Sequence, residues 1–535
     1  MNEKHAKTIP NVGEHRLSRR AAMIAGGAGV AANLGAIGKA AAHAATPEAT
    51  PATTATQDWQ AFDSAVETAA AAMNVVGTAI VVVDRTGIVH STMFGVRDLT
   101  TNAPVTEETH FSVASTTKSM TSLMVATHVD EGLFGWDDLV HEVWPGFRAP
   151  SDELTATMRV RDLIGMDSGI GEPEAVSSFH QGDPTAGELL QLIVNFPVDN
   201  PPQTTFFYNN TVYAVGGYLP ALAEGVAISD LGTAYASMMN ERVYGAAGMD
   251  IARIADDPRP YFDNYARGHE VDFLEGYLPR PWPPVGSFAP VGGTVATVTD
   301  MANYVAMQLN KGVAVDGTRV VSEVNLAECW KPHVDIPTSP DFDPDLTHAG
   351  YGMGWIHQTY RDGRSLTWHN GGIDGFTSFI GFMPDDDLGF VVLSNLGPLA
   401  GGLYFYPYVT NLLLGSRFGF NEGVNDKILA QVQAAAKTTQ DTAAQATAVD
   451  PTAIEPFLGF YERGHGLSFD AAGALRLRQS ARSIRLMAMP GGSYVMAGGY
   501  LAGLPVIFSI DDDGQRWMEV KGIETVRWSS GPGLE

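Results

Sequence analysis

The sequence predicts an α+β fold for residues 58–420, followed by a small antiparallel β-sheet or barrel over residues 454–535. In the first region, strand-like apolar runs occur only towards the two ends, and helical patterns fill the middle. In the second region, short alternating segments recur between turn signals such as Pro490-Gly-Gly and Asp513-Gly. A low-complexity segment rich in Ala, Gln and Thr, residues 421–453, is predicted to be a partly helical linker between them.

Length and composition indicate a globular protein with more than one domain. The chain has 535 residues, 45% of them hydrophobic, which is too long for one compact core. A net charge of −27 argues against nucleic acid or an anionic membrane as a partner. Cys329 is the only cysteine, so no internal disulfide is possible, and we expect it to be a buried small hydrophobe. The sequence has no C-x-x-C or H-E-x-x-H pattern, and no metal or other cofactor is expected.

The first 44 residues are predicted to be an export signal. Arg19-Arg20 precedes an uncharged, mildly apolar run rich in Ala and Gly, and Ala42-His43-Ala44 is an A-x-A cleavage pattern. These features are typical of a twin-arginine signal, although the usual aromatic residue after the arginine pair is absent. So many Ala and Gly residues argue against a membrane-spanning helix. We expect export to the periplasm or the medium, with residues 45–57 as a disordered linker.

The elements of the first region follow from caps, periodicity and turn residues. In chain order they are a helix from Trp59 capped by Asp58, a hairpin of strands 78–83 and 88–94, a helix from Ser115 to about Asp130, a short helix at 160–169 with a glycine C-cap, a helix at 188–196, an irregular segment at 250–290 interpreted as a pocket wall, a helix at 301–309 capped by Asp300, strands at 377–383 and 389–394, and a helix at 399–414.

Ser115 and Lys118 form the first pattern that points to chemistry. They stand three residues apart where an extended segment runs into a helix, so their side chains leave the same face. Lysine can take the proton of a serine hydroxyl if burial keeps its amine neutral. The helix N-terminus adds N–H donors at the reacting centre. Taken alone, the pair is equally compatible with an N-cap serine and a solvated lysine.

Two further patterns place polar side chains next to regular elements. Tyr208 and Asn210 precede a helix, where a tyrosine can shuttle protons and an asparagine can hold a carbonyl group. His369 leaves a strand just before Gly371 and Gly372, where a backbone N–H can point at an oxyanion. We expect His369 to change charge between pH 5 and 8. Loop packing and a structural histidine are the alternatives.

In this order and spacing, Ser115-x-x-Lys118, Tyr208-x-Asn210 and His369-x-Gly371-Gly372 resemble the three motifs of the serine β-lactamase and penicillin-binding-protein superfamily. The most similar group is the class C β-lactamase-like one (the S12 peptidase type), with DD-peptidases, D-aminopeptidases and esterases. The resemblance covers about residues 58–415. His369 stands where β-lactamases usually carry lysine, as in many peptidase and esterase members, which argues against lactam hydrolysis. Met166-Asp167 replaces the common His-Thr.

The resemblance implies a β-lactamase-like fold. An antiparallel sheet would combine the first hairpin with the strands after His369, with helices on its faces and a helical subdomain between. The site would lie between the sheet edge that carries His369 and the helix that carries Ser115. The C-terminal segment resembles the lipocalin-like module of some S12 relatives.

The implied function is that of an exported serine hydrolase. Ser115 would form an acyl-enzyme, Lys118 and Tyr208 would share the proton transfers, and either could be the base for acylation. Backbone N–H groups of Ser115 and Gly372 would form the oxyanion hole, and Asn210 and His369 would orient the substrate. The substrate, a small molecule or peptide, stays open among D-amino-acid peptides, amides, esters and lactams. The alternative is a non-catalytic or slowly deacylating receptor for penicillin or a cell-wall peptide.

Overall fold

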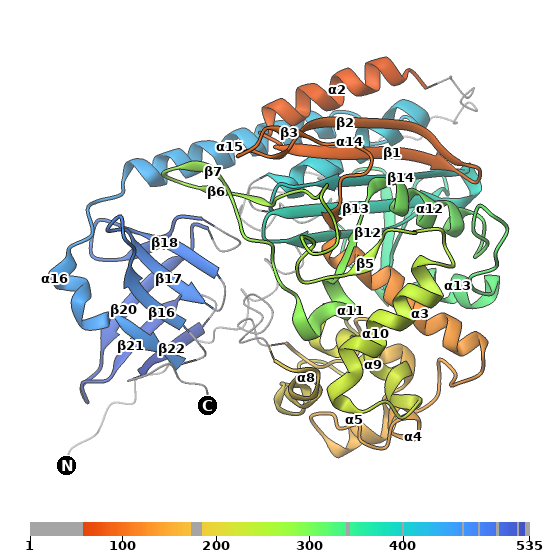
Figure 1. Ribbon diagram of the computed structural model, residues 1–535, viewed down its shortest axis with the longest axis horizontal. Helices are drawn as coiled ribbons and strands as arrows, with labels where there is room; N and C mark the ends of the chain where they lie inside the picture. The colour runs from red at the N-terminus through yellow and green to blue at the C-terminus, as the bar shows by residue number, and fades with distance from the viewer. Residues whose placement is uncertain are drawn as a thin grey trace, which may run out of the picture.

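The computed structural model describes residues 57–172, 184–338, 343–398, 401–462, 465–479, 482–498, 502–521 and 524–529 (Figure 1). The predicted export signal and all but the last residue of the linker at 45–57 lie outside the described residues. Figure 1 shows a larger part, built of helices around a sheet, with a smaller barrel beside it.

A nine-stranded antiparallel sheet forms the centre of the larger part, in the order β3-β2-β1-β14-β13-β12-β11-β10-β9. Its strands are β1 (Gly77–Asp84), β2 (Gly87–Asp98), β3 (Ala103–Pro104), β9 (Val334–Asp335), β10 (Leu346–Tyr351), β11 (Ile356–Tyr360), β12 (Ser365–Ile373), β13 (Phe376–Met383) and β14 (Leu388–Ser394). The predicted hairpin is β1–β2, and the strands predicted after His369 are β13 and β14. Thr78 lies opposite Ser394, so the two ends of the region meet in one sheet, as predicted.

Helices cover both faces of this sheet, which explains why β13 and β14 are buried along their whole length. On one face, α2 (Trp59–Ala72), capped by Asp58 as predicted, packs against α14 (Gly402–Phe418). On the other, α12 (Val298–Leu309) packs against β1, β13 and β14. Thr297 is the N-cap of α12, and Asp300, the predicted cap, completes a capping box at the third helical position.

The central helix α3 (Thr117–Asp130) is buried from Thr117 to His128, and further helices complete this side of the larger part. They are α4 (Val140–Val143), α5 (Asp152–Thr157), α6 (Val160–Ile164), α8 (Ala186–Leu192), α9 (Asn210–Ala223), α10 (Leu231–Met239), α11 (Ala289–Gly292) and α13 (Glu323–Trp330). Of these, α9, α10, α11 and α13 pack against α3. The helix predicted at 160–169 ends at Ile164, and Gly169, with φ +74°, lies in the chain that follows it.

Residues 250–290 contain short strands, contrary to the irregular segment expected there. β5 (Arg253–Ile254) joins β4 (Phe111–Ser112) and β8 (Thr294–Ala296) in a small sheet. β6 (His269–Asp272) and β7 (Gly276–Pro279) form a hairpin. At its tip the N–H of Phe273 donates to the carbonyl oxygen of Ala497 at 2.7 Å, so this hairpin reaches the C-terminal barrel.

The segment predicted as a partly helical linker forms one long helix, α15 (Val424–Ala444), followed by α16 (Pro451–Ile454). Val424 and Ile428 are buried in the core of the larger part, whereas most later side chains of α15 are exposed. The first turns of α15 are therefore anchored to the larger part of the chain.

The C-terminal segment folds into a closed barrel of eight antiparallel strands, in agreement with the predicted fold class. Strands adjacent in sequence are adjacent in the barrel, and β15 pairs with β22 to close it, which leaves no unpaired edge. The strands are β15 (Gly459–Tyr461), β16 (His465–Phe469), β17 (Leu475–Gln479), β18 (Arg482–Ala488), β19 (Tyr494–Met496), β20 (Pro505–Ile510), β21 (Arg516–Val520) and β22 (Glu524–Ser529).

Within the described part of the chain, no single helix is long and apolar enough to cross a bilayer. Only the bent pair Asn210–Ala223 and Ile228–Tyr244 passes that test jointly, by length and composition. The same residues contain no group of three or more His, Cys, Asp or Glu side chains that could hold a metal ion.

Candidate active site

Ser115 lies on a tight turn between a short strand and the central helix. A 3-10 turn at Ala114–Thr116 follows β4 and leads directly into α3. Ala114 has φ +46°, a left-handed conformation that non-glycine residues rarely adopt. Ser378 Oγ donates to the carbonyl oxygen of Val113 at 2.6 Å and ties the turn to β13. Ser115 itself is only half-buried, so its hydroxyl is within reach of a substrate.

Lys118 belongs to the first turn of α3 and is completely buried. Its Nζ lies 3.1 Å from Ser115 Oγ and donates to the carbonyl oxygen of Val291 at 3.2 Å. Burial lowers the pKa of Lys118 well below its usual value, against the opposing effect of the Glu172 carboxylate. A neutral amine in this position can take the serine proton. The structure thus brings the two side chains together, with Ser115 just before α3 rather than in its first turn.

Tyr208 lies beside Lys118, on the loop that precedes α9. The Lys118 Nζ is 4.7 Å from the centroid of the Tyr208 ring. The loop is held by Asn209, the N-cap of α9, whose side chain also donates to the carbonyl oxygen of Ile170 at 3.0 Å. Asn210, expected on the loop, is the first residue of the helix and is half-buried.

His369 is buried on β12 and has a partner at each ring nitrogen. Its Nδ1 lies 2.5 Å from the carbonyl oxygen of Asn370, and its Nε2 lies 3.1 Å from the Tyr351 hydroxyl. Because a carbonyl oxygen only accepts, Nδ1 carries the proton and Nε2 accepts from Tyr351. Burial, and next the charge of Lys118, lower the pKa of His369 to about 3. His369 is therefore neutral from pH 5 to 8, and the titration expected in that range is wrong.

β12 meets the turn that carries Ser115 (residues 113–116, the serine turn) along a local sheet edge. The strand is interior in the sheet order, but β11 pairs only with residues 365–368, so residues 369–373 have a strand partner on one side alone, β13. A Cβ atom on Gly371 would lie 2.3 Å from a carbonyl oxygen of the serine turn and 3.0 Å from Ser115 N. Only glycine allows this approach. Gly372 follows and is exposed.

Two residues near the site were missed by the sequence analysis. The buried Tyr351 packs its ring edge-on, 6.0 Å from the His369 ring, and burial raises its pKa well above the usual value, so its hydroxyl remains a donor. The buried Glu172 accepts from the backbone N–H and hydroxyl of Thr211 at 2.8 and 2.7 Å. The stretch Tyr351-Gly-Met-Gly-Trp355, which is similar to the superfamily framework, is a signal that could have found Tyr351, whereas no sequence signal pointed to Glu172.

These groups have complementary chemistry. A half-buried hydroxyl faces a buried amine whose pKa is low, a phenol ring lies against that amine, and a glycine-lined strand edge approaches the same turn. Nucleophile, proton acceptor and backbone donors are what acyl transfer needs. Fold and site together define a member of the penicillin-binding and serine β-lactamase class.

Comparison with known families agrees with this class. The family described as Beta-lactamase matches residues 62–404, and the chain belongs to that family. The chain is 27% identical over 302 residues to the unguisins hydrolase ungD' of Aspergillus campestris, covering 55% of this chain and 53% of that protein. It is 26% identical over 313 residues to penicillin-binding protein 4 of Amycolatopsis lactamdurans, covering 58% and 78%.

A third relative is a D-aminopeptidase of Cereibacter sphaeroides, 26% identical over 318 residues, with 58% of this chain and 54% of that protein covered. The match thus spans about half the length of the unguisins hydrolase and of the D-aminopeptidase.

Two solved structures share the fold. The octameric penicillin-binding protein homologue from Pyrococcus abyssi has a TM-score of 0.57 at 20% identity, with 88% of this chain and 100% of that chain covered. SurE has a TM-score of 0.51 at 21% identity, with 88% and 98% covered. At this identity the likeness concerns the fold alone.

Proposed function

We propose that this protein is a serine hydrolase that cleaves amide or ester bonds through an acyl-enzyme on Ser115. The observation that carries the proposal is the 3.1 Å between Lys118 Nζ and Ser115 Oγ, in surroundings that lower the pKa of the lysine. The relatives are named a hydrolase, a D-aminopeptidase and a penicillin-binding protein, which supports a carbonyl substrate.

In the first half-reaction, Ser115 Oγ bonds to the carbonyl carbon and its proton passes to the pair formed by Lys118 and Tyr208. The bond to the leaving amine or alcohol then breaks, and the leaving group takes that proton. In the second half-reaction, water attacks the acyl-serine ester, the same pair accepts its proton, and the proton returns to Ser115 Oγ as the acid product departs. Lys118 Nζ lies 4.7 Å from the centroid of the Tyr208 ring, so both residues border the space beside Ser115.

The backbone N–H groups of Ser115 and Gly372 are the proposed donors to the oxyanion. Losing one such donor typically costs about 3 kcal/mol of transition-state stabilisation. Gly371 supports this role because its missing side chain lets β12 approach the serine turn. Asn210, at the start of α9, is proposed to hold the substrate carbonyl group on the opposite side.

His369 is proposed to influence the choice of substrate. Because its pKa is about 3, it presents no positive charge where β-lactamases usually carry lysine. A substrate carboxylate, such as that of a penicillin, would therefore gain no ion pair at this position. For this reason we favour neutral esters, and amide bonds of D-amino-acid peptides that carry no carboxylate beside the cleaved bond, over β-lactams.

The test is covalent labelling followed by a substrate panel. A fluorophosphonate should add to Ser115 of the full chain, as detected by peptide mass spectrometry, and should not add to the Ser115→Ala variant. The unlabelled protein should turn over p-nitrophenyl esters and D-alanyl peptides with a blocked C-terminus faster than a chromogenic lactam, and labelling should abolish this turnover. A long-lived acyl adduct without turnover would instead identify a penicillin- or peptide-binding receptor. Failure to label would refute the serine mechanism.

We also propose export through the twin-arginine route, to the periplasm or the medium. The support is the sequence of residues 1–44, with Arg19-Arg20 ahead of a weakly apolar run. Changing both arginines to lysine should retain the chain in the cytoplasm, while Ser18→Ala should leave export unchanged. Export that survives the double substitution would contradict this route.

A further inference from the structure

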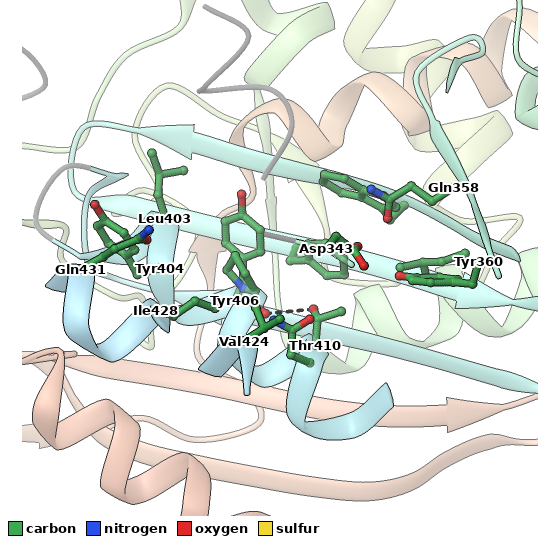
Figure 2. A pocket seen from close by; sticks show the side chains of 15 residues that line it. Asp343, Gln358, Tyr360, Leu403, Tyr404, Tyr406, Thr410, Val424, Ile428 and Gln431 are labelled. Carbon is green, nitrogen blue, oxygen red and sulfur yellow. Dashed lines mark hydrogen bonds between the residues drawn. The ribbon is translucent and has the colours of Figure 1, made fainter. Parts of the chain in front are cut away.

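A second pocket lies on the face of the sheet that α14 and α15 cover (Figure 2). Its volume is about 610 Å³, counted out to where it opens to solvent. Leu366 and Trp368 of β12 line it, and side chains alternate between the faces of a strand, so the intervening Thr367 and the following His369 belong to the opposite face. The pocket and the candidate active site therefore use the two faces of one strand.

Most of the pocket wall is aromatic or aliphatic. Phe379 stacks on Trp368 and on Tyr406, each at a ring-centroid distance of 5.3 Å. α14 adds Leu403, and α15 adds Ile428. In Figure 2, Tyr406 stands near the middle of the lining, with Leu403 to its left and Asp343 to its right. Such a wall suits a flat apolar body.

Three polar atoms in this wall lack a hydrogen-bond partner among the described residues. They are the Nε1–H of Trp368, Oδ1 of Asp343 and Oε1 of Gln431. Trp368 is only 3% exposed, so its N–H has little access to bulk water. Buried polar groups are normally paired, because an unpaired one loses its hydration without compensation. One donor and two acceptors in a single pocket therefore indicate a ligand with polar atoms of its own.

Asp343 gives the pocket its charge preference. None of the ion pairs among the described residues includes it, and Arg361, on the neighbouring chain segment, is paired with Asp345 at 2.9 Å. Burial, and next the Asp345 carboxylate, raise the pKa of Asp343 to about 7, against hydrogen bonds from the Asn421 side chain and the backbone N–H groups of Asp345 and Leu346. A bound cation would favour the ionised carboxyl group. Tyr360, which lies beside Asp343 in Figure 2, offers a ring to the same cation.

We propose that this pocket binds a small aromatic amine that also carries a neutral hydrogen-bond acceptor. The ammonium group donates to Asp343, the acceptor receives the Trp368 N–H, and the ring lies against Tyr406 and Ile428.

The probe is 4-methoxyphenethylamine, titrated into the full chain at pH 8 by calorimetry. Its ether oxygen is the acceptor, and its amine is protonated at that pH. We expect Asp343→Asn to weaken binding about tenfold or more, as loss of a charge-assisted bond does. Asp385→Asn, an exposed acid on the β13–β14 turn, is the matched control and should leave affinity unchanged. Trp368→Phe keeps an aromatic wall and removes the N–H, so it should weaken this probe more than phenethylamine, which lacks the acceptor.

A comparison on the unchanged chain decides the proposal even if Asp343→Asn fails to fold. Replacing the amine by a hydroxyl, in 4-methoxyphenethyl alcohol, should weaken binding about tenfold. Equal affinity for amine and alcohol, equal weakening by Asp343→Asn and Asp385→Asn, or no binding up to about 10 mM of the amine would overturn the proposal.

Discussion

Burial of basic groups governs the chemistry of single residues at the candidate active site. Lys118 is completely buried, and His369 is 1% exposed. Desolvation disfavours the charged form of both, and whenever Lys118 is protonated its charge disfavours a charged His369 further. A lysine that would be a cation in water is therefore available as a proton acceptor for Ser115.

Replacing Lys118 by arginine tests this role. A guanidinium group stays protonated and cannot take the serine proton. We expect kcat for a p-nitrophenyl ester to fall about 10²- to 10⁴-fold, the usual loss when a general base is removed. Lys311→Arg, an exposed lysine, is the control and should have no effect. Steady-state kinetics on variants whose melting temperature matches the parent would measure this, and a near-normal Lys118→Arg would exclude Lys118 as the base.

The pH dependence of kcat/KM should report Lys118 and not His369. The base must be neutral, so activity should fall as the pH drops through the pKa of Lys118 in the folded protein. Because burial lowers that pKa, activity should persist to a lower pH than an ordinary lysine would allow. His369, with a pKa of about 3, adds no charge change above pH 5. In plots of kcat/KM against pH, the wild type and His369→Asn should lose half of their activity at the same acidic pH. A shift of that pH by more than about one unit would mean that His369 contributes to the loss.

Among the elements, β12 serves both faces of the sheet. Because successive side chains of a strand point to opposite faces, His369 points towards the serine turn, whereas Trp368 and Asn370 point towards α14. Asn370 Nδ2 donates to the Tyr406 hydroxyl at 3.0 Å, and the Asn370 carbonyl oxygen accepts from His369. The strand can approach Ser115 only because Gly371 has no side chain.

Gly371→Ala should therefore damage the site. The new Cβ atom would lie 2.3 Å from the Val113 carbonyl oxygen. Neither side can easily move, because Ser378 holds this carbonyl group and β12 is paired with β13. We expect a loss of ester turnover of about 10²-fold or more, with a lower melting temperature, because the strand and the serine turn must separate. Gly232→Ala is the matched control, since its Cβ atom would meet nothing within 4 Å. Full activity in Gly371→Ala would show that this approach is not needed.

At the scale of the whole molecule, the β6–β7 hairpin connects the barrel to the candidate active site. At one end the Phe273 N–H donates to Ala497 of the barrel at 2.7 Å. At the other end, Glu270 Oε1 accepts from the Gly375 N–H at 2.9 Å, in the turn that follows Gly372. The barrel is thus docked on an element that supports the proposed oxyanion strand.

Two truncations should separate stabilisation from substrate selection. A chain that ends at Asn421 loses Val424 and Ile428, and burial of each such side chain contributes about 1.5–3 kcal/mol. We expect its free energy of unfolding to fall by several kcal/mol. A chain that ends at Ala444 keeps these anchors and should keep turnover of a small ester, whereas turnover of longer peptides should change because the hairpin loses its contact with the barrel.

Denaturant unfolding and kinetics on short and long substrates would measure both truncations. Equal effects of the Ala444 truncation on the two substrate types would mean that the barrel stabilises the protein without selecting substrates. Equal stability of the two truncated chains would mean that Val424 and Ile428 are not anchors.

The features that could be predicted from the sequence are those set by residues close together along the chain. Asp58 caps α2, the turn before Gly87 joins β1 to β2, and a three-residue spacing brings Lys118 to Ser115. These features depend on neighbours along the chain. The N-cap of α12 was predicted to be Asp300 but is Thr297. The two residues form the two halves of one capping box, so either is a reasonable cap from the sequence.

The sequence by itself determined the fold class, a small antiparallel sheet or barrel after it, and the three motifs that mark the candidate site, whereas the closure of the barrel by β15 and β22 came from the structure. Only the tertiary structure decided the state of the groups within it. His369 is neutral because Tyr351, Lys118 and the surrounding core desolvate and flank it, and Glu172 acts on Lys118 from another part of the chain. Burial and charge proximity arise from packing between distant segments, and no pattern of neighbouring residues encodes them.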